Sequence, residues 1–410
     1  MTTDALPRER HIGRALLPLG LVFLAVGTST AIFFPFLSLF LNTAVEAGPV
    51  KVTVFLVGGP LAGVLMSSLV ARLSDRRAIR RRILIGAALA GVVGCGLTAV
   101  VRNYWVLLAL TVTAIALAGS LFPQSFAYAR QVLVRDVPDR AAMGISTLRT
   151  VFSLAWVAGP PLAAVLLETG GFRYVYGAAA ALYAIAALVA IFWLDEVAAP
   201  AAPEPGDPPP PFDDRPESSR RTLWLTAAAF TLLQCPLTLG VQALPLFITE
   251  DLGGKVSAAG LILGLCAFLE MPLLLGFGWL ATRVRVRILL LAGAAFGVVY
   301  ELAAAVTTTV GLLAAAQIVN ALFIAAISGL GISYMQDMLP REPGRATTLF
   351  TNSFPIGAML AGPLFGLSQQ FGFRLAYVIS AALCAAGLLV LLVVKPRPQP
   401  RLPPGTPLPE

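Results

Sequence analysis

The chain carries a series of long apolar segments separated by short polar connections. A helix rises about 1.5 Å per residue, so about 20 apolar residues cross the hydrocarbon core of a bilayer. The 410 residues are 58% hydrophobic and 12% charged, whereas soluble domains have about 25% charged residues. The sequence therefore predicts an all-α integral membrane protein with twelve transmembrane helices, at residues 15–41, 50–72, 83–101, 104–130, 143–167, 172–194, 222–249, 256–281, 288–306, 309–337, 346–370 and 373–394.

Basic residues are distributed unevenly between alternating connections. Those on the side of the N-terminus hold clusters such as Arg80–Arg82, and the opposite ones hold single cations: Lys51, Arg102, Arg173, Lys255 and Arg374. Cytoplasmic connections carry an excess of Lys and Arg. We therefore predict that both termini are cytoplasmic, and that the net charge of +8 reflects topology and not nucleic-acid binding.

A proline-rich segment divides the chain into two halves of six helices. It includes Pro208–Pro211 and several acidic residues, a composition that cannot bury a core and favours an extended linker. The predicted organisation is a cytoplasmic tail (1–14), an N-terminal six-helix bundle (15–195), a cytoplasmic linker (196–221), a C-terminal six-helix bundle (222–395) and a disordered cytoplasmic tail (396–410).

The two halves share an internal repeat. Ala158-Gly159-Pro160-Pro161-Leu162, followed by Gly171-Phe172-Arg173, recurs as Ala361-Gly362-Pro363-Leu364, followed by Gly372-Phe373-Arg374. Both copies lie at the fifth-to-sixth helix position of their half. We therefore expect two pseudo-symmetric bundles, an arrangement that places a substrate site near the bilayer midplane between them.

Arg149 and Trp156 lie seven residues apart within the fifth predicted helix, so their side chains project from one face. An arginine inside hydrocarbon costs at least ~2.5–3.5 kcal/mol and is expected to face a cavity. There it would donate hydrogen bonds to substrate hydroxyls or to a carboxylate. The alternatives are a structural ion pair or a snorkelling side chain for Arg149, and simple packing or lipid contact for Trp156.

Glu270 lies near the middle of the eighth predicted helix. A desolvated carboxylate without a neighbouring base is a candidate proton-binding group. Pro272 frees a backbone carbonyl nearby, which favours local irregularity beside the cavity. A structural pairing with Arg149 across the halves is the alternative, and it is compatible with proton coupling.

Amide side chains within the predicted spans suit a hydroxyl-rich ligand. The candidates are Gln124, Gln242, Gln317, Asn320 and Asn352, and each could instead make a hydrogen bond between helices. Counting back from the repeated Gly-Pro pair places Asn352 opposite Arg149. Asp337 and Arg345 flank the connection between helices ten and eleven near the cytoplasmic surface, so we predict gating or topology roles for them and not ligand contact.

Several chemical functions are disfavoured by residue usage. Cys95, Cys235, Cys266 and Cys384 are scattered singly, and the one histidine, His11, lies in the N-terminal tail. We therefore expect no metal site and no cofactor. A membrane enzyme would need a nucleophile–base or metal cluster at membrane depth, and a sensor without transport would need a signalling domain that the sequence does not show.

The segment ARLSDRRAIRRR at 71–82 resembles the signature between helices two and three of the major facilitator superfamily. Asp75, Arg76 and Arg80 match that pattern, while Ala71 and Ala78 replace its glycines. In the superfamily this loop closes the cytoplasmic side through charged groups. The resemblance therefore implies gating roles for Asp75, Arg76 and Arg80.

A closer resemblance is to the bacterial sugar efflux transporter family. It is carried by Ser38–Leu41, Phe126–Arg130, Ser153–Ala163, Leu269–Pro272 and the polar stretch from Gln336 to Ser353. It implies proton-linked export of sugars or sugar-like molecules, with the alternative of a multidrug/proton antiporter that has a broad apolar cavity. We expect a monomeric, multi-pass protein of the bacterial inner membrane whose partners are a small-molecule substrate, protons and lipid.

Overall fold

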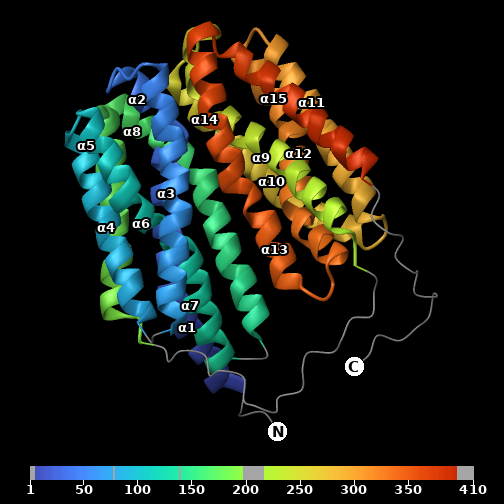
Figure 1. The fold of residues 1–410 in the computed structure, drawn as a ribbon. Helices are drawn as coiled ribbons and strands as arrows, with labels where there is room; N and C mark the ends of the chain where they lie inside the picture. The colour runs from blue at the N-terminus through green and yellow to red at the C-terminus, as the bar shows by residue number, and fades with distance from the viewer. Residues whose placement is uncertain (1–4, 77–78, 138–139, 197–216, 395–410) are drawn as a thin grey trace.

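The chain forms a bundle of long helices in a computed structural model that describes residues 5–76, 79–137, 140–196 and 217–394 (Figure 1). The N-terminal half contains α1 (Ala5–Phe33), η1 (Phe34–Phe36), α2 (Leu37–Thr43), α3 (Pro49–Arg76), α4 (Arg80–Val100), α5 (Tyr104–Leu110), η2 (Thr111–Ile115), α6 (Ala116–Gly119), α7 (Leu121–Asp136) and α8 (Ala141–Phe192). The C-terminal half contains α9 (Arg220–Leu246), η4 (Phe247–Asp251), α10 (Val256–Ala281), α11 (Val286–Val306), α12 (Val310–Met338), α13 (Pro343–Thr351), α14 (Ser353–Phe371) and α15 (Arg374–Val393). Most of the expected linker and the C-terminal tail lie outside these ranges.

The structure confirms the predicted all-helical membrane class but divides the apolar segments differently. Within the described ranges, ten helical stretches are long and apolar enough to cross a membrane. One of them, α8, consists of two helices that meet at Gly171, where the backbone is not helical, and it covers the two predicted spans 143–167 and 172–194. The predicted span 346–370 is two helices, α13 and α14, which meet at Asn352. The glutamines and serines of α14 lower its hydropathy, so it is not among the ten.

Two other predicted spans contain local interruptions. The first passes from α1 through the 3₁₀ turn η1, where Pro35 cannot donate a backbone hydrogen bond, into α2. The fourth contains a five-residue π-helical segment, η2, between α5 and α6, a deviation that is frequent at functional sites. In addition, α1 begins at Ala5, inside the segment predicted as a tail.

The sequence repeat corresponds to a structural one at two glycines. Gly171 bends α8 with a φ of 63°, and Gly372 separates α14 from α15 with a φ of 100°. Residues with a Cβ atom rarely adopt such angles. Each glycine therefore lets the chain turn at the same place in its half.

A pair of arginines repeats as well, at the opposite end of the bundle. Arg81 at the start of α4 donates to the carbonyl of Ala190 (3.1 Å) near the end of α8. Arg287 at the start of α11 donates in the same way to the carbonyl of Leu391 (3.0 Å) near the end of α15. The last carbonyls of a helix have no partner within it, so each arginine completes a helix end and interacts favourably with its dipole.

The two halves touch along two equivalent seams. In the first, α10 packs on α8, and a Cβ atom on Gly264 would lie 2.8 Å from the carbonyl oxygen of Val157. In the second, α14 packs on α3, and a Cβ atom on Gly362 would lie 2.9 Å from Val57. Small residues allow such close backbone approach between membrane helices. The glycines therefore set how tightly the halves can close.

Candidate functional site

Arg149 and Glu270 face each other across the seam between α8 and α10. The Arg149 side chain is exposed and that of Glu270 is half-buried. The two groups interact electrostatically, and neither side chain is hydrogen-bonded to another described residue. The structure thus brings together the cation and the carboxylate that the sequence singled out, one from each half, with their hydrogen-bonding atoms available.

Trp156 adds an aromatic surface to this region. It lies two turns beyond Arg149 on α8 and is half-buried. Its ring makes an edge contact with that of Phe34, at 6.4 Å between centroids. Phe34 begins the break in the first membrane helix. The cation, the carboxylate and two aromatic rings therefore lie in one region at the boundary between the halves.

Gln317 and Asn320 belong to a hydrogen-bonded group on the C-terminal side of the site. Asn320 Nδ2 donates to Gln317 Oε1 at 2.9 Å and reaches Cys266 Sγ at 3.5 Å. Gln317 Nε2 donates to the hydroxyl of Tyr300 at 3.1 Å. Cys266 lies one turn before Glu270 on α10. This group therefore connects the helix of Glu270 to α12 and α11.

Gln242 is fully buried and bridges the halves. Its Nε2 donates to the carbonyl of Phe34 (2.9 Å), and its Oε1 accepts from the backbone N–H of Ser38 (3.1 Å). Ser38 Oγ also donates to the Gln242 carbonyl. The Ser38 N–H is in the first turn of α2 and has no partner within that helix. Gln242 is thus a cross-half cap, the helix–helix role that the sequence left open for it.

Further bridges lie at the same end of the bundle. Gln369 Nε2 donates to Asn42 Oδ1 at 2.9 Å, and Asn42 Nδ2 donates to Glu250 Oε1 at 3.3 Å. Figure 1 shows α2 and the end of α14 close together at the top of the bundle. Ser38, Asn42, Gln242 and Gln369 form what we call the latch. The two halves are therefore closed at the end that carries α2.

Two of the candidate amides lie elsewhere. Gln124 is buried within the N-terminal half, 5% exposed, and its Oε1 has no partner in the described part of the chain. Asn352 is exposed at the junction between α13 and α14. Among the described residues, no side-chain hydrogen bond or ion pair joins either of them to Arg149 or Glu270.

The candidate gating residues lie at the ends of helices away from the latch. Arg80 is buried at the start of α4, and Asp337 is half-buried near the end of α12. Arg345 is exposed and donates to Glu342 Oε2 at 2.8 Å, a local pair that raises the pKa of its guanidinium. Asp75 and Arg76 occupy the last turn of α3, and their side chains lie outside the description.

Sequence reasoning missed Glu301 on α11. Its side chain is 1% exposed, and its Oε2 has no hydrogen-bond partner among the described residues. It lies within the predicted span 288–306. An ionisable residue inside a membrane helix is a functional candidate by default, so this signal was present in the sequence.

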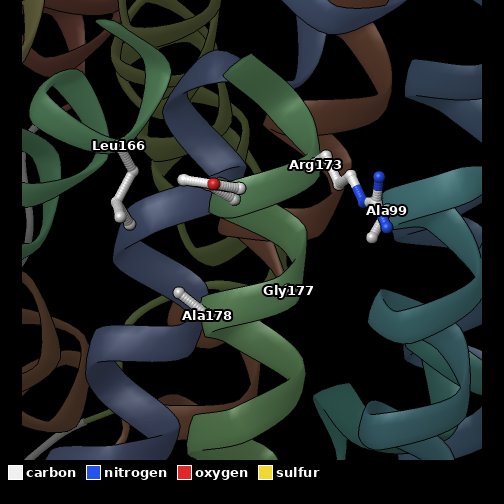
Figure 2. A pocket seen from close by; sticks show the side chains of 6 residues that line it. Ala99, Leu166, Arg173, Gly177 and Ala178 are labelled. Carbon is white, nitrogen blue, oxygen red and sulfur yellow. The ribbon is translucent and has the colours of Figure 1, made fainter. Parts of the chain in front are cut away.

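A shallow recess of about 330 Å³ lies between α4 and α8 (Figure 2). Its lining is Ala99, Leu166, Arg173, Tyr174, Gly177 and Ala178. Figure 2 shows the Arg173 side chain pointing toward Ala99. At 1.5 Å per residue, even the nearest of the α8 residues is about 25 Å from Arg149 along the helix. The recess is therefore separate from the candidate site.

Comparison with known sequences gives consistent matches over most of the chain. A sequence model of the Major Facilitator Superfamily matches residues 19–241 and again residues 237–410. Sugar efflux transporter A of Dickeya chrysanthemi is 32% identical over 366 residues, covering 89% of this chain and 92% of that protein. Sugar efflux transporter B of Salmonella typhimurium is 33% identical over 377 residues, covering 89% and 93%.

Solved structures match the fold at much lower identity. The nucleoside transporter NupG superimposes with a TM-score of 0.73 at 13% identity, covering 93% of this chain and 98% of that one. A bacterial homologue of the human lysosomal transporter Spinster, in an inward-facing and occupied conformation, gives a TM-score of 0.70 at 15% identity, with coverage of 92% and 96%.

Proposed function

Because this chain belongs to the Major Facilitator Superfamily and to its bacterial sugar efflux transporters, we propose that it exports sugars or sugar-like small molecules in exchange for protons. Like its relatives, it is a membrane transporter and not an enzyme. The observation that carries the proposal is that Arg149 and Glu270, one from each half, lie close enough to interact electrostatically across the boundary between the halves.

The chemistry of this pair suits a ligand rich in hydroxyl groups. The guanidinium of Arg149 supplies several donors in a fixed plane. The ionised carboxylate of Glu270 accepts hydrogen bonds, and charge-assisted bonds of this kind are stronger than neutral ones. The rings of Trp156 and Phe34 offer apolar faces to the C–H side of a sugar. Gln317 and Asn320, beside Cys266, would add amide groups at the edge of the site, and we keep Gln124, Gln242 and Asn352 as more distant candidates.

The exchange of proton for sugar follows from the two states of Glu270. The carboxylate accepts sugar hydroxyls and interacts with Arg149, whereas the protonated acid loses its charge and much of its acceptor strength. A sugar and a proton therefore compete for one group. Because the site binds either the sugar or the proton, it carries one across the membrane in each direction as it faces the two sides in turn. The sugar and the proton therefore move in opposite directions.

We assign the latch to the outer side of the membrane. This follows from a topology of twelve spans, in bundles 15–195 and 222–395 joined by a cytoplasmic linker, with both termini cytoplasmic in a bacterial inner membrane. The described conformation is then inward-facing, and a monomer is sufficient for transport. Alternating access would open the latch and close the cytoplasmic ends, where Asp75, Arg76, Arg80, Asp337 and Arg345 lie.

Binding measurements on the purified chain test the proposal. A thermal-shift screen of mono- and disaccharides is followed by calorimetry on Arg149→Ala and on Arg173→Ala, a matched arginine on the same helix beside the recess. Loss of charge-assisted hydrogen bonds worth about 1.5–3 kcal/mol weakens sugar binding by about tenfold to a hundredfold in the first variant only. Equal affinities would remove Arg149 from the site. Stabilisation by lipophilic drugs and by no sugar would favour a multidrug antiporter.

A further inference from the structure

A second carboxyl group lies inside the membrane portion of the C-terminal half. Glu301 is 1% exposed on α11, and its Oε2 lacks a partner within the described ranges. The function proposed above does not use it. Burying a carboxylate without a partner is costly, and a group in this position becomes neutral instead. An acid at membrane depth therefore needs an explanation of its own.

The surroundings of Glu301 are polar but not basic. One turn earlier, a Cβ atom on Gly297 would lie 3.1 Å from Cys384 Sγ, which fixes the facing surface of α15. Tyr377 and Cys384 both interact electrostatically with Glu301. Ser380 lies between them on the same face of α15. The hydroxyls of Tyr377 and Ser380 have no partners among the described residues either.

The remaining neighbours complete an enclosure of four helices. Cys235 on α9 interacts electrostatically with Glu301, and Tyr300 precedes it on α11. From α12, Phe323 packs on the Gly297 turn and contributes no titratable group.

The charged groups nearby lie toward one end of α11. Arg374 donates to the carbonyl of Thr307 at 2.9 Å, beyond the end of the helix. Asp251 of η4 interacts electrostatically with Tyr377. Among the described residues, no lysine or arginine forms an ion pair or hydrogen bond with Glu301.

We propose that Glu301 is a second proton-binding site, which holds a proton in this conformation and exchanges it during transport. The carboxylate takes up one proton to form the neutral acid, which needs no cation beside it in this buried position. A sodium ion fits less well, because such sites draw on unwound backbone carbonyls, and α11 is a regular helix from Val286 to Val306.

A hydrogen-bonded chain links this acid to the candidate substrate site. Tyr300, next to Glu301, accepts from Gln317, which accepts from Asn320, which reaches Cys266 on the helix of Glu270. A shift of α10 against α12 during transport therefore displaces the turn that holds Glu301. This displacement changes how well the acid is enclosed, and hence how readily it releases its proton.

Infrared spectroscopy of the full chain in liposomes tests the site without a sugar. At neutral pH, exposed carboxyls with ordinary pKa values of about 4 are ionised, so a protonated buried acid gives a separate carbonyl-stretching band. The band is expected in the wild type and in Glu270→Gln, and it should be missing in Glu301→Gln. An unchanged band in Glu301→Gln would overturn the proposal, as would a wild-type band that vanishes when sodium replaces potassium.

The exchange of the proton during transport rests on the proposed function and has its own readout. In proteoliposomes, the ratio of protons to sugar moved is expected to fall in Glu301→Gln relative to the wild type. An unchanged ratio would make the proton of Glu301 purely structural and overturn this part. If the wild type moved no sugar, the proposed function would fail, while the infrared band would still decide whether Glu301 binds a proton.

Discussion

The close packing of α8 on α10 depends on Gly264, which has no side chain at the point of contact. A Cβ atom on Gly264 would lie 2.7 Å from Pro161 Cγ and 2.8 Å from the Val157 carbonyl oxygen. Ordinary van der Waals contact begins at 3.4 Å, so Gly264→Ala forces the helices apart by about 0.6 Å. One of the two neighbours is backbone and cannot rotate away. The substitution should therefore disfavour the conformation in which the latch is closed.

The expected size follows from the cost of overpacking. Inserting a methyl group into a tight contact costs about 1–3 kcal/mol, and each 1.4 kcal/mol changes an equilibrium about tenfold. The ratio of latch-closed to latch-open molecules should fall by about fivefold to a hundredfold. Gly276→Ala on the same helix is the matched control, because a Cβ atom there meets nothing within 4 Å. Both substitutions gain the same helix propensity, about 1 kcal/mol.

Cross-linking across the latch measures this ratio. Asn42→Cys and Gln369→Cys replace two side chains that are hydrogen-bonded at 2.9 Å, and the four native cysteines are buried. A short bifunctional thiol reagent then reports how often the halves meet at this end. Cross-linking should slow when Gly264→Ala is added and stay unchanged with Gly276→Ala. Equal rates in both would refute the reasoning that Gly264 sets the closeness of the halves.

Three further predictions concern single positions. In the wild type, sugar affinity should fall as the pH is lowered, because protonation removes the Glu270 carboxylate. In Glu270→Gln it should be weak at every pH, and calorimetric titrations that still show pH dependence would point to another group. Gln242→Met leaves the Ser38 N–H unpaired, at about 1–3 kcal/mol, and removes one of the two donors to the Phe34 carbonyl. The same latch cross-linking should therefore slow; an unchanged rate would argue against the cap. Gly171→Ala should lower the thermal unfolding midpoint through about 1–3 kcal/mol of backbone strain, whereas Gly177→Ala, helical and equally uncrowded, should not.

The membrane class and the internal repeat could both be inferred from the amino-acid pattern. Apolar runs long enough for a bilayer have few stable alternatives to a helix, because backbone groups in lipid must be satisfied within the segment. The repeated Gly-Phe-Arg in the sequence coincides with equivalent turns in the two halves, at Gly171 and Gly372. The cost of a charge in hydrocarbon likewise selected Arg149 and Glu270 from the sequence alone.

Tertiary structure decided how these groups are combined. The sequence does not specify the hydrogen-bond partner of an amide side chain. Gln242 and Gln317 are therefore equivalent candidates when only the sequence is known. One of them caps a helix of the other half, and the other joins a chain that ends at Tyr300. The break at Asn352 was equally hidden, since local apolarity does not report backbone angles. Glu301 was identifiable from the sequence as an acid inside a membrane helix, but its enclosure by four helices appeared only in the fold. The desolvation of a side chain depends on helices far apart in the sequence, and only the packed fold specifies them.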